Sequence, residues 1–356
     1  METGQNIIIK DILTEAIKAG ASDIHFSVGN YPVLRVNQEL RYLEDRDLIN
    51  SEFMEKLADS LLDAKQKEAL SLNKEVIISH SFDKLLRFKI NIFYQRGFLS
   101  VTLRHIPTQI PTLDSLGLGE LKKLTEFKRG LVIVSGSFGS GRSTTVAAML
   151  DEINRTRKEY ILTIEDPIEY IFNNNLSIIE QREVGRDTNS FADALQYFQE
   201  EDGDVLFLEQ LADPKIIPAV LEIASGSSLV LTAVAASSAA KTVSGILNNF
   251  TTFDEERVRD MLANALKAVV CQKMIPKIGG GVKVVCEVLI VNDKVKSTIA
   301  GGNISQLDNI IQTSRREGML SFTQSLLTAY RNQEISLEEA LAQAPDRAAL
   351  ENLINQ

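Results

Sequence analysis

The sequence of 356 residues contains no tryptophan, three histidines and two cysteines, so several classes of protein are excluded at the outset. Two cysteines, Cys271 and Cys286, are too few for the disulfide framework of a small secreted domain. The paired C-x-x-C spacing of a zinc ribbon is also missing, so we expect no zinc site. Valine and isoleucine residues flank both cysteines, and we therefore expect buried, reduced thiols.

Charge and hydropathy exclude further classes. Lysine and arginine number 38 against 48 aspartate and glutamate residues, which gives a net charge of −10. This balance is the opposite of what a nucleic-acid groove needs. No apolar run reaches the roughly 18 residues of a membrane helix, and residues 1–10 lack the basic and apolar regions of a signal peptide. We expect a cytoplasmic protein that binds no nucleic acid and is not an integral membrane protein.

The N-terminal part of the chain resembles a small domain of its own. The chain length predicts about two domains at roughly 150 residues each. Residues 9–17 and 52–71 carry the apolar stripes of amphipathic helices, and residues 86–93 alternate like a strand with one wet face. Residues 107–119 hold two prolines and two glycines, which favours a linker. We therefore predict an α+β domain over residues 1–106.

The C-terminal part, residues 120–356, has a different pattern. Apolar runs alternate with helical stretches, which is typical of a parallel sheet buried on both faces. The expected strands are 131–135, 160–165, 204–208, 228–233 and 282–291, and the expected helices are 143–155, 190–199, 214–224, 239–248 and 254–270, with further helices after 306. The predicted fold class is therefore α/β, with a larger domain that ends in helices.

A glycine-rich segment after the first of these strands has the spacing of a phosphate-binding loop. Its residues are Gly136, Ser137, Phe138, Gly139, Ser140, Gly141, Arg142, Ser143 and Thr144. The pattern is G-x-x-x-x-G-K-[ST] with arginine in the lysine position, and it stands between a strand and a helix as the motif requires. Glycines let backbone amides point at phosphate oxygens, the helix N-terminus adds partial positive charge, and the Ser143 hydroxyl can reach Mg²⁺. The segment predicts binding of Mg-ATP.

Arg142 keeps the charge of the usual lysine but changes its shape. The guanidinium is larger, planar and forked, whereas lysine is a compact point charge. A glycine-rich turn that holds no nucleotide is the alternative interpretation of this segment.

Four segments resemble the PilT-like retraction ATPases of type IV pili, within the type II/IV secretion ATPase superfamily. They are GLVIVSGSFGSGRSTTVAAM at 130–149, ILTIEDPIEY at 161–170, QREVGRDTNS at 181–190 and SAAKT at 238–242. The resemblance implies a PAS-like N-terminal domain, a RecA-like P-loop domain and a hexameric ring with nucleotide between the domains of adjacent subunits. It also implies roles in twitching motility or secretion. The absent tetracysteine motif places the chain nearer the retraction branch than the assembly ATPases.

Several family positions are changed in this sequence. Gln210 replaces the glutamate that ends the family's Walker B strand, and a neutral amide cannot accept a proton as a carboxylate does. Ala235 replaces the histidine of the family's histidine box, and Gln196 and Glu200 stand where the family has arginines. The segment at 295–302 retains little of the retraction signature. Since phosphoryl transfer depends on placed charge, these changes predict weak or absent hydrolysis.

Other family positions are retained. Glu165, in the family's acidic box, remains a possible general base, although a solvated strand-end turn explains it equally well. Arg87 and Arg104 occupy positions whose arginines approach the phosphates of a neighbouring subunit in this family, like a trans arginine finger. Ser143 and Asp204 are the predicted Mg²⁺ ligands.

Three functions remain open from the sequence. The leading hypothesis is a pseudo-ATPase subunit that assembles with itself or with an active PilT-like paralogue in a hexameric ring and contacts the pilus inner-membrane platform protein. This would place it peripherally at the inner face of the membrane. The second is an active Mg-dependent ATPase that powers retraction. The third is an interaction module that binds no nucleotide.

Overall fold

The computed structural model describes residues 4–36, 39–83, 86–198, 200–211 and 213–355. The chain divides into two units, one of residues 1–109 with 167–171 and the other of residues 110–166 with 172–356. The division after residue 109 falls inside the segment expected to be a linker. The grouping of 167–171 with the first unit has no signal in the sequence.

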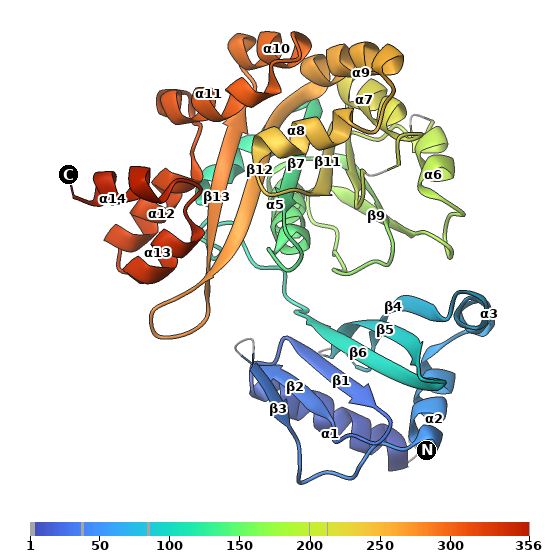
Figure 1. The fold of residues 1–356 in the computed structure, drawn as a ribbon. Helices are drawn as coiled ribbons and strands as arrows, with labels where there is room; N and C mark the ends of the chain where they lie inside the picture. The colour runs from blue at the N-terminus through green and yellow to red at the C-terminus, as the bar shows by residue number, and fades with distance from the viewer. Residues whose placement is uncertain (1–3, 37–38, 84–85, 199, 212, 356) are drawn as a thin grey trace. The chain divides into compact units, whose positions relative to one another are not determined.

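The first unit is an antiparallel sheet with three helices (Figure 1). Its elements are α1 (Gly4–Lys18), β1 (Asp23–Ser27), β2 (Val33–Val36), β3 (Glu39–Tyr42), α2 (Ser51–Leu61), α3 (Ala64–Asn73), β4 (Glu75–Ser81), β5 (Arg87–Gln95) and β6 (Phe98–Ile106). The strand order is β3-β2-β1-β6-β5-β4. The apolar stripe of α1 and the buried residues of α2 pack with one face of the sheet in a single core.

One helix expected over residues 52–71 is in fact two. The backbone leaves helical geometry at Leu62, and Asp63 then caps α3 by accepting a hydrogen bond from the Gln66 amide while the Gln66 side chain accepts from the Asp63 amide. This reciprocal capping box satisfies two amides at the new helix start. The D-x-x-Q spacing of Asp63 and Gln66 in the sequence indicates this second helix start.

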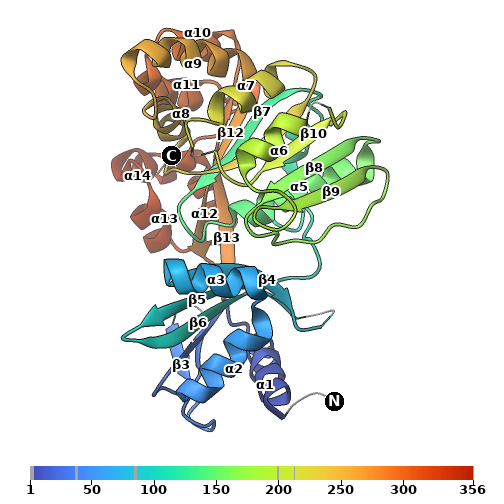
Figure 2. The ribbon, with the colours of Figure 1, turned by 90° about the vertical axis from the view of Figure 1, so that its right-hand side faces the viewer.

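The second unit is a seven-stranded sheet covered by helices on both faces (Figures 1 and 2). Its elements are η1 (Gly119–Leu121), α4 (Lys122–Thr125), β7 (Gly130–Gly136), α5 (Arg142–Thr156), β8 (Tyr160–Glu165), β9 (Ile178–Glu183), α6 (Phe191–Phe198), β10 (Val205–Leu208), α7 (Ile217–Ser225), β11 (Leu229–Ala235), α8 (Ala239–Leu247), α9 (Thr252–Ala265), β12 (Leu266–Pro276), β13 (Val282–Ile290), α10 (Asp293–Ala300), η2 (Ile304–Gln306), α11 (Leu307–Thr313), η3 (Arg315–Glu317), α12 (Phe322–Arg331), α13 (Leu337–Gln343) and α14 (Arg347–Ile354). The strand order is β13-β12-β7-β11-β10-β8-β9, parallel except for β13.

The apolar run of β7 explains why this sheet has two covered faces. Leu131 and Ile133 face the core that α6 to α11 share, whereas Val132 and Val134 face the core formed with α5. Alternate side chains of a strand point to opposite faces, so a strand buried on both faces must be apolar throughout. A separate apolar cluster joins α12, α13 and α14 to the β12–β13 hairpin (Figure 2).

Two strands of this sheet were not anticipated. Residues 266–270 were expected to continue a helix, but α9 ends at Ala265 and β12 begins at Leu266. The alternative was visible in the β-branched Val269 and Val270, which favour a strand. The other missed strand, β9, has a mixed polar pattern because it lies at the sheet edge.

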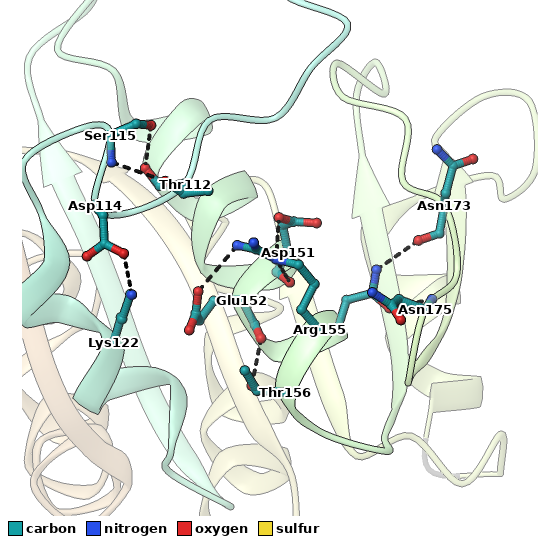
Figure 3. A network of polar contacts seen from close by, with 11 residues as sticks. Thr112, Asp114, Ser115, Lys122, Asp151, Glu152, Arg155, Thr156, Asn173 and Asn175 are labelled. Carbon is teal, nitrogen blue, oxygen red and sulfur yellow. Dashed lines mark hydrogen bonds and ion pairs between the residues drawn. The ribbon is translucent and has the colours of Figure 1, made fainter.

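The expected linker is largely built into the second unit. Leu113 and Leu118 are buried in the core that contains α5. The Ser115 amide donates to Thr112 Oγ1 at 3.1 Å, and Lys122 forms an ion pair with Asp114 (Figure 3). Only residues 107–109 of the expected linker group with the first unit.

No helix among the residues that the structure describes is both long enough and apolar enough to cross a membrane.

Candidate functional site

The carboxyl ends of the parallel strands bring most of the predicted site residues to one edge of the second unit's sheet. β7 continues into the phosphate loop, and Ala235 at the end of β11 pairs in register with Gly136. Glu165 ends β8, and Gln210 follows β10 by two residues. Crevices at this edge of an open α/β sheet are where ligands bind.

The glycines of the phosphate loop are required by its backbone. Gly139 and Gly141 have φ of +74° and +86°, a region that costs other residues energy. Gly136 has a different constraint, since a Cβ there would collide with Ser140 and lie 2.6 Å from the Gln272 carbonyl oxygen. The loop is therefore close-packed from behind.

The loop opens into helix α5, which starts at Arg142 with Gly141 as its N-cap residue. Backbone N–H groups of a first helical turn lack partners within the helix and attract anions. Ser143 is the second residue of this turn. This arrangement suits the phosphate groups of a nucleotide.

Glu165 is held in place by two side chains. Its Oε1 accepts hydrogen bonds from Thr163 Oγ1 at 2.6 Å and from Gln181 Nε2 at 3.1 Å, and the residue is 5% exposed. Thr163 and Gln181 face each other in register on β8 and β9. The Glu165 carboxylate is thus held in one orientation at the carboxyl end of β8 and is not freely solvated.

The residues after β10 stand next to the end of β8. The Glu209 amide donates to the Ile164 carbonyl at 3.1 Å, and Glu209 Oε2 accepts from the Asp166 amide at 2.5 Å. Glu209 therefore supports the turn that follows Glu165. Gln210 is the next residue and is exposed.

The segment that joins β11 to α8 is anchored on buried polar groups. Thr242 Oγ1 lies 2.9 Å from Ser135 Oγ, one residue before the phosphate loop. Glu287 on β13 accepts a hydrogen bond from the Ala239 amide at 2.7 Å, at the start of α8. These contacts connect the segment after Ala235 to the strand beneath the loop.

Burial shifts the pKa of several groups near this anchor. Glu287 is 7% exposed, and desolvation raises the pKa of its carboxyl, opposed by the hydrogen bond from Ala239. Burial also raises the pKa of Cys271 to about 11 and that of Cys286 to about 12. Both cysteines are free and buried, as the sequence predicted.

Asp204 does not belong to this edge, so the prediction that it shares a magnesium ion with Ser143 is wrong. Its Oδ2 accepts a hydrogen bond from the Tyr160 amide at 2.9 Å, at the start of β8. β11 pairs with both β10 and β7, and its residue Leu229 is in register with Val205 at the start of β10 and with Gly130 at the start of β7. From Gly130 to the loop at Gly136 the strand advances about 20 Å, at about 3.3 Å per residue. Asp204 precedes its strand and therefore lies at the opposite edge of the sheet.

The two arginines predicted to act in trans lie in the first unit and have partners there. Arg87 donates from Nε to the Glu169 carbonyl at 2.7 Å and from Nη2 to the Ile168 carbonyl at 2.6 Å. Arg104 donates from Nε to Asp23 Oδ1 at 2.9 Å.

Sequence reasoning missed the polar residues that β12 and β13 place behind the loop, namely Gln272 and Glu287. Each interrupts an apolar run with a polar side chain, and both are buried. A lone polar residue in a buried strand needs a partner, and that signal was available. Which partner it has depends on the packing of distant strands.

The comparisons with known proteins agree with this geometry. The family described as "Type II/IV secretion system protein" matches residues 3–348. The type IV pilus retraction ATPase PilT of Pseudomonas aeruginosa is 34% identical over 337 residues, covering 94% of this chain and 98% of that protein. A twitching motility protein of Neisseria gonorrhoeae is also 34% identical, covering 90% of this chain and 86% of that protein.

A solved structure shows the same fold. The crystal structure of the pilus retraction motor PilT with bound ADP superimposes with a TM-score of 0.84 at 37% sequence identity, covering 96% of this chain and 98% of that chain. The chain therefore belongs to the type II/IV secretion system protein family and, within it, to the PilT-like motor ATPases of type IV pili, with an N-terminal domain followed by a RecA-like ATPase domain.

Proposed function

We propose that this chain is a nucleotide-binding subunit of a type IV pilus motor, that its own ATP hydrolysis is weak or absent, and that it acts as an accessory or regulatory partner of an active motor subunit. One observation carries the proposal. The glycine-rich loop joins β7 to α5, while Gln210 and Ala235 stand at neighbouring strand ends, where the family resemblance implies glutamate and histidine.

Nucleotide binding is supported by the positive φ angles of Gly139 and Gly141 and by the start of α5 directly after the loop. The Ser143 hydroxyl would contact Mg²⁺, and Arg142 would supply a fixed positive charge near the phosphates. The related PilT structure was solved with bound ADP, which supports nucleotide binding by this chain.

Weak hydrolysis follows from the groups that replace the family's catalytic ones. A glutamine at position 210 and an alanine at 235 can neither take up a proton nor bind a metal as a carboxylate or an imidazole does. Because catalysis of phosphoryl transfer is mostly positioning and charge stabilisation, losing both groups should cost orders of magnitude in rate.

The partners that we propose are a second copy of this chain or an active PilT-like paralogue in a hexameric ring, together with the pilus platform protein at the inner face of the membrane. In such a ring Arg87 and Arg104 would approach a neighbouring subunit's nucleotide. Each would then exchange its present hydrogen bonds for contacts with phosphate oxygens.

Phosphate release from the purified chain with excess Mg-ATP, beside an Arg142→Ala variant, tests the proposal. Binding of Mg-ADP with no turnover above that of the variant is the expected result. Turnover at the rate of an intact retraction motor would contradict it.

An active ATPase is the second candidate, and the ordered carboxylate of Glu165 favours it. A general base must be oriented as well as ionised, and Thr163 and Gln181 provide the orientation. If the chain is an active ATPase, Arg142→Ala should abolish ATP turnover, and Glu165→Gln should abolish it as well. Unchanged turnover in Glu165→Gln would remove Glu165 as the base.

A further inference from the structure

β12 passes directly beneath the phosphate loop. Gln272 pairs in parallel register with Gly136, the first residue of the loop. Its side-chain Nε2 donates a hydrogen bond to the Ser140 carbonyl oxygen at 2.6 Å. Gln272 is 0% exposed and Ser140 is 3% exposed, so this bond is fully shielded from water. Hydrogen bonds in such surroundings are stronger than those at the surface.

β12 also lies against the loop at two of its glycines. A Cβ on Gly141 would lie 2.5 Å from Met274 Cε and 3.3 Å from Gln272 Nε2. A Cβ on Gly136 would lie 2.6 Å from the Gln272 carbonyl oxygen. Gln272 therefore touches the loop at its start, at its middle and at its end.

The bond to Ser140 has a consequence for the next N–H group. In a planar trans peptide the C=O and the following N–H point in opposite directions. Because Gln272 pulls the Ser140 carbonyl toward β12, the N–H of Gly141 must point away from β12. A phosphate held by this N–H group would therefore lie on the side of the loop away from β12.

The side-chain amide is the only part of the Gln272 side chain that can donate a hydrogen bond to the Ser140 carbonyl. A carbonyl oxygen accepts and does not donate, so the nitrogen end of the Gln272 amide must face Ser140. Gln272 Oε1 and Ser140 Oγ have no hydrogen-bond partner among the residues that the structure describes. The Nε2 bond is therefore the one hydrogen bond that the Gln272 side chain makes among these residues, and a substitution without a donor removes it.

We infer that Gln272 is a positioning residue for nucleotide binding, because its amide fixes the Ser140 carbonyl and thereby aims the Gly141 N–H at the phosphate site. The inference rests on the proposed nucleotide-binding function. Gln272 itself touches the loop and not the nucleotide.

The test compares Gln272→Leu and Gln272→Met with a control amide elsewhere in the unit. Leucine removes the donor at similar volume, and methionine removes it while keeping an unbranched side chain. The control is Asn154→Leu. Asn154 is 2% exposed and lies in the last turn of α5, away from the loop. Its Nδ2 donates to the Asn173 carbonyl at 2.8 Å, which is a buried amide-to-carbonyl bond like that of Gln272, and its Oδ1 also accepts from the Asn175 amide at 3.0 Å. Asn154→Leu therefore removes at least as much hydrogen bonding as Gln272→Leu.

The first readout is the Kd of a fluorescent Mg-ADP analogue, measured with the Tm of the nucleotide-free protein. We expect both Gln272 variants to bind at least tenfold more weakly than the unchanged chain. Asn154→Leu should lower the Tm by at least as much as the Gln272 variants do, but its Kd should stay within twofold of that of the unchanged chain. A merely structural role for Gln272 would lower Tm and leave Kd unchanged, and that result in a folded variant would overturn the inference.

The second readout needs no nucleotide. Hydrogen exchange of a peptide covering residues 136–144 should be faster in Gln272→Leu than in Asn154→Leu at matched stability, and equal exchange would overturn the inference. If the unchanged chain binds no Mg-ADP, the proposed function fails, and the exchange comparison alone decides whether Gln272 shapes the loop. If Gln272→Leu does not fold, Gln272→Met, which keeps an unbranched side chain, gives the same two readouts.

Discussion

Replacing Gly141 by alanine should separate loop geometry from general stability. Gly141 has φ of +86°, where an alanine costs about 1–2 kcal/mol. The new Cβ would also lie 2.5 Å from Met274 Cε, but this is the end of a flexible side chain that is 38% exposed, so it can move aside. The expected loss of stability is therefore about 1–2 kcal/mol, mostly from the backbone.

Nucleotide affinity should fall in addition to this loss of stability. Gly141 is the N-cap residue of α5, so relaxing its backbone changes the aim of the amides that would receive phosphate. We expect the Kd for Mg-ADP to rise at least tenfold, which corresponds to about 1.4 kcal/mol. Titration calorimetry gives the Kd, and urea unfolding gives the free energy.

Gly279→Ala is the matched control. Gly279 has φ of +84°, nearly the same as Gly141, and a Cβ there would meet nothing within 4 Å. Its stability cost should again be about 1–2 kcal/mol, while its affinity for Mg-ADP should stay within twofold. If both variants weaken binding equally, or if Gly141→Ala binds as well as the unchanged chain, the assignment of this loop to phosphate is refuted.

Three further predictions follow from the site and its surroundings. Asp204→Ala should lower stability by about 0.5–1.5 kcal/mol through the lost acceptor, yet it should leave the Mg²⁺ dependence of nucleotide binding unchanged, whereas Ser143→Ala should reduce that dependence. A magnesium titration of both variants checks this, and loss of Mg²⁺ dependence in Asp204→Ala would restore Asp204 as a ligand. Burial raises the pKa of Glu287 in the folded protein, so the stability that its carboxyl contributes is greatest below the unfolded pKa and is lost as pH rises through the folded pKa. Urea unfolding between pH 4.5 and about 7.5 should therefore show Glu287→Gln gaining stability relative to the unchanged chain as pH rises. Parallel stability profiles for the two proteins would contradict this. Because their pKa values are raised to about 11 and about 12, Cys271 and Cys286 should react with a thiol reagent at pH 8 only as fast as the protein opens; a rapid burst from either thiol would argue against their burial.

Much of the phosphate site could be predicted from sequence because its determinants are local. The glycine spacing between a buried strand and a helix predicts the loop, and Gly141, the second glycine of that spacing, has the positive φ that favours glycine. The position of Glu165 at a strand end was likewise readable. The error at Asp204 was avoidable, since a residue that precedes a parallel strand must lie at the edge opposite the loop.

The helix expected over residues 254–270 shows where local patterns fail. Its second half is apolar, and short apolar runs do not distinguish a buried helix from a buried strand. In the folded chain, pairing with β7 and β13 decides in favour of a strand from Leu266 onward.

The sequence by itself determined the phosphate loop, the two-part organisation and the family, because each depends on residues close together in the chain or on overall pattern. Only the tertiary structure decided what supports the loop. Gln272 reaches Ser140 from 132 positions away, and Glu287 reaches Ala239 from 48 positions away. Such partners depend on strand order and register, which are set by the packing of the whole sheet and not by any single segment.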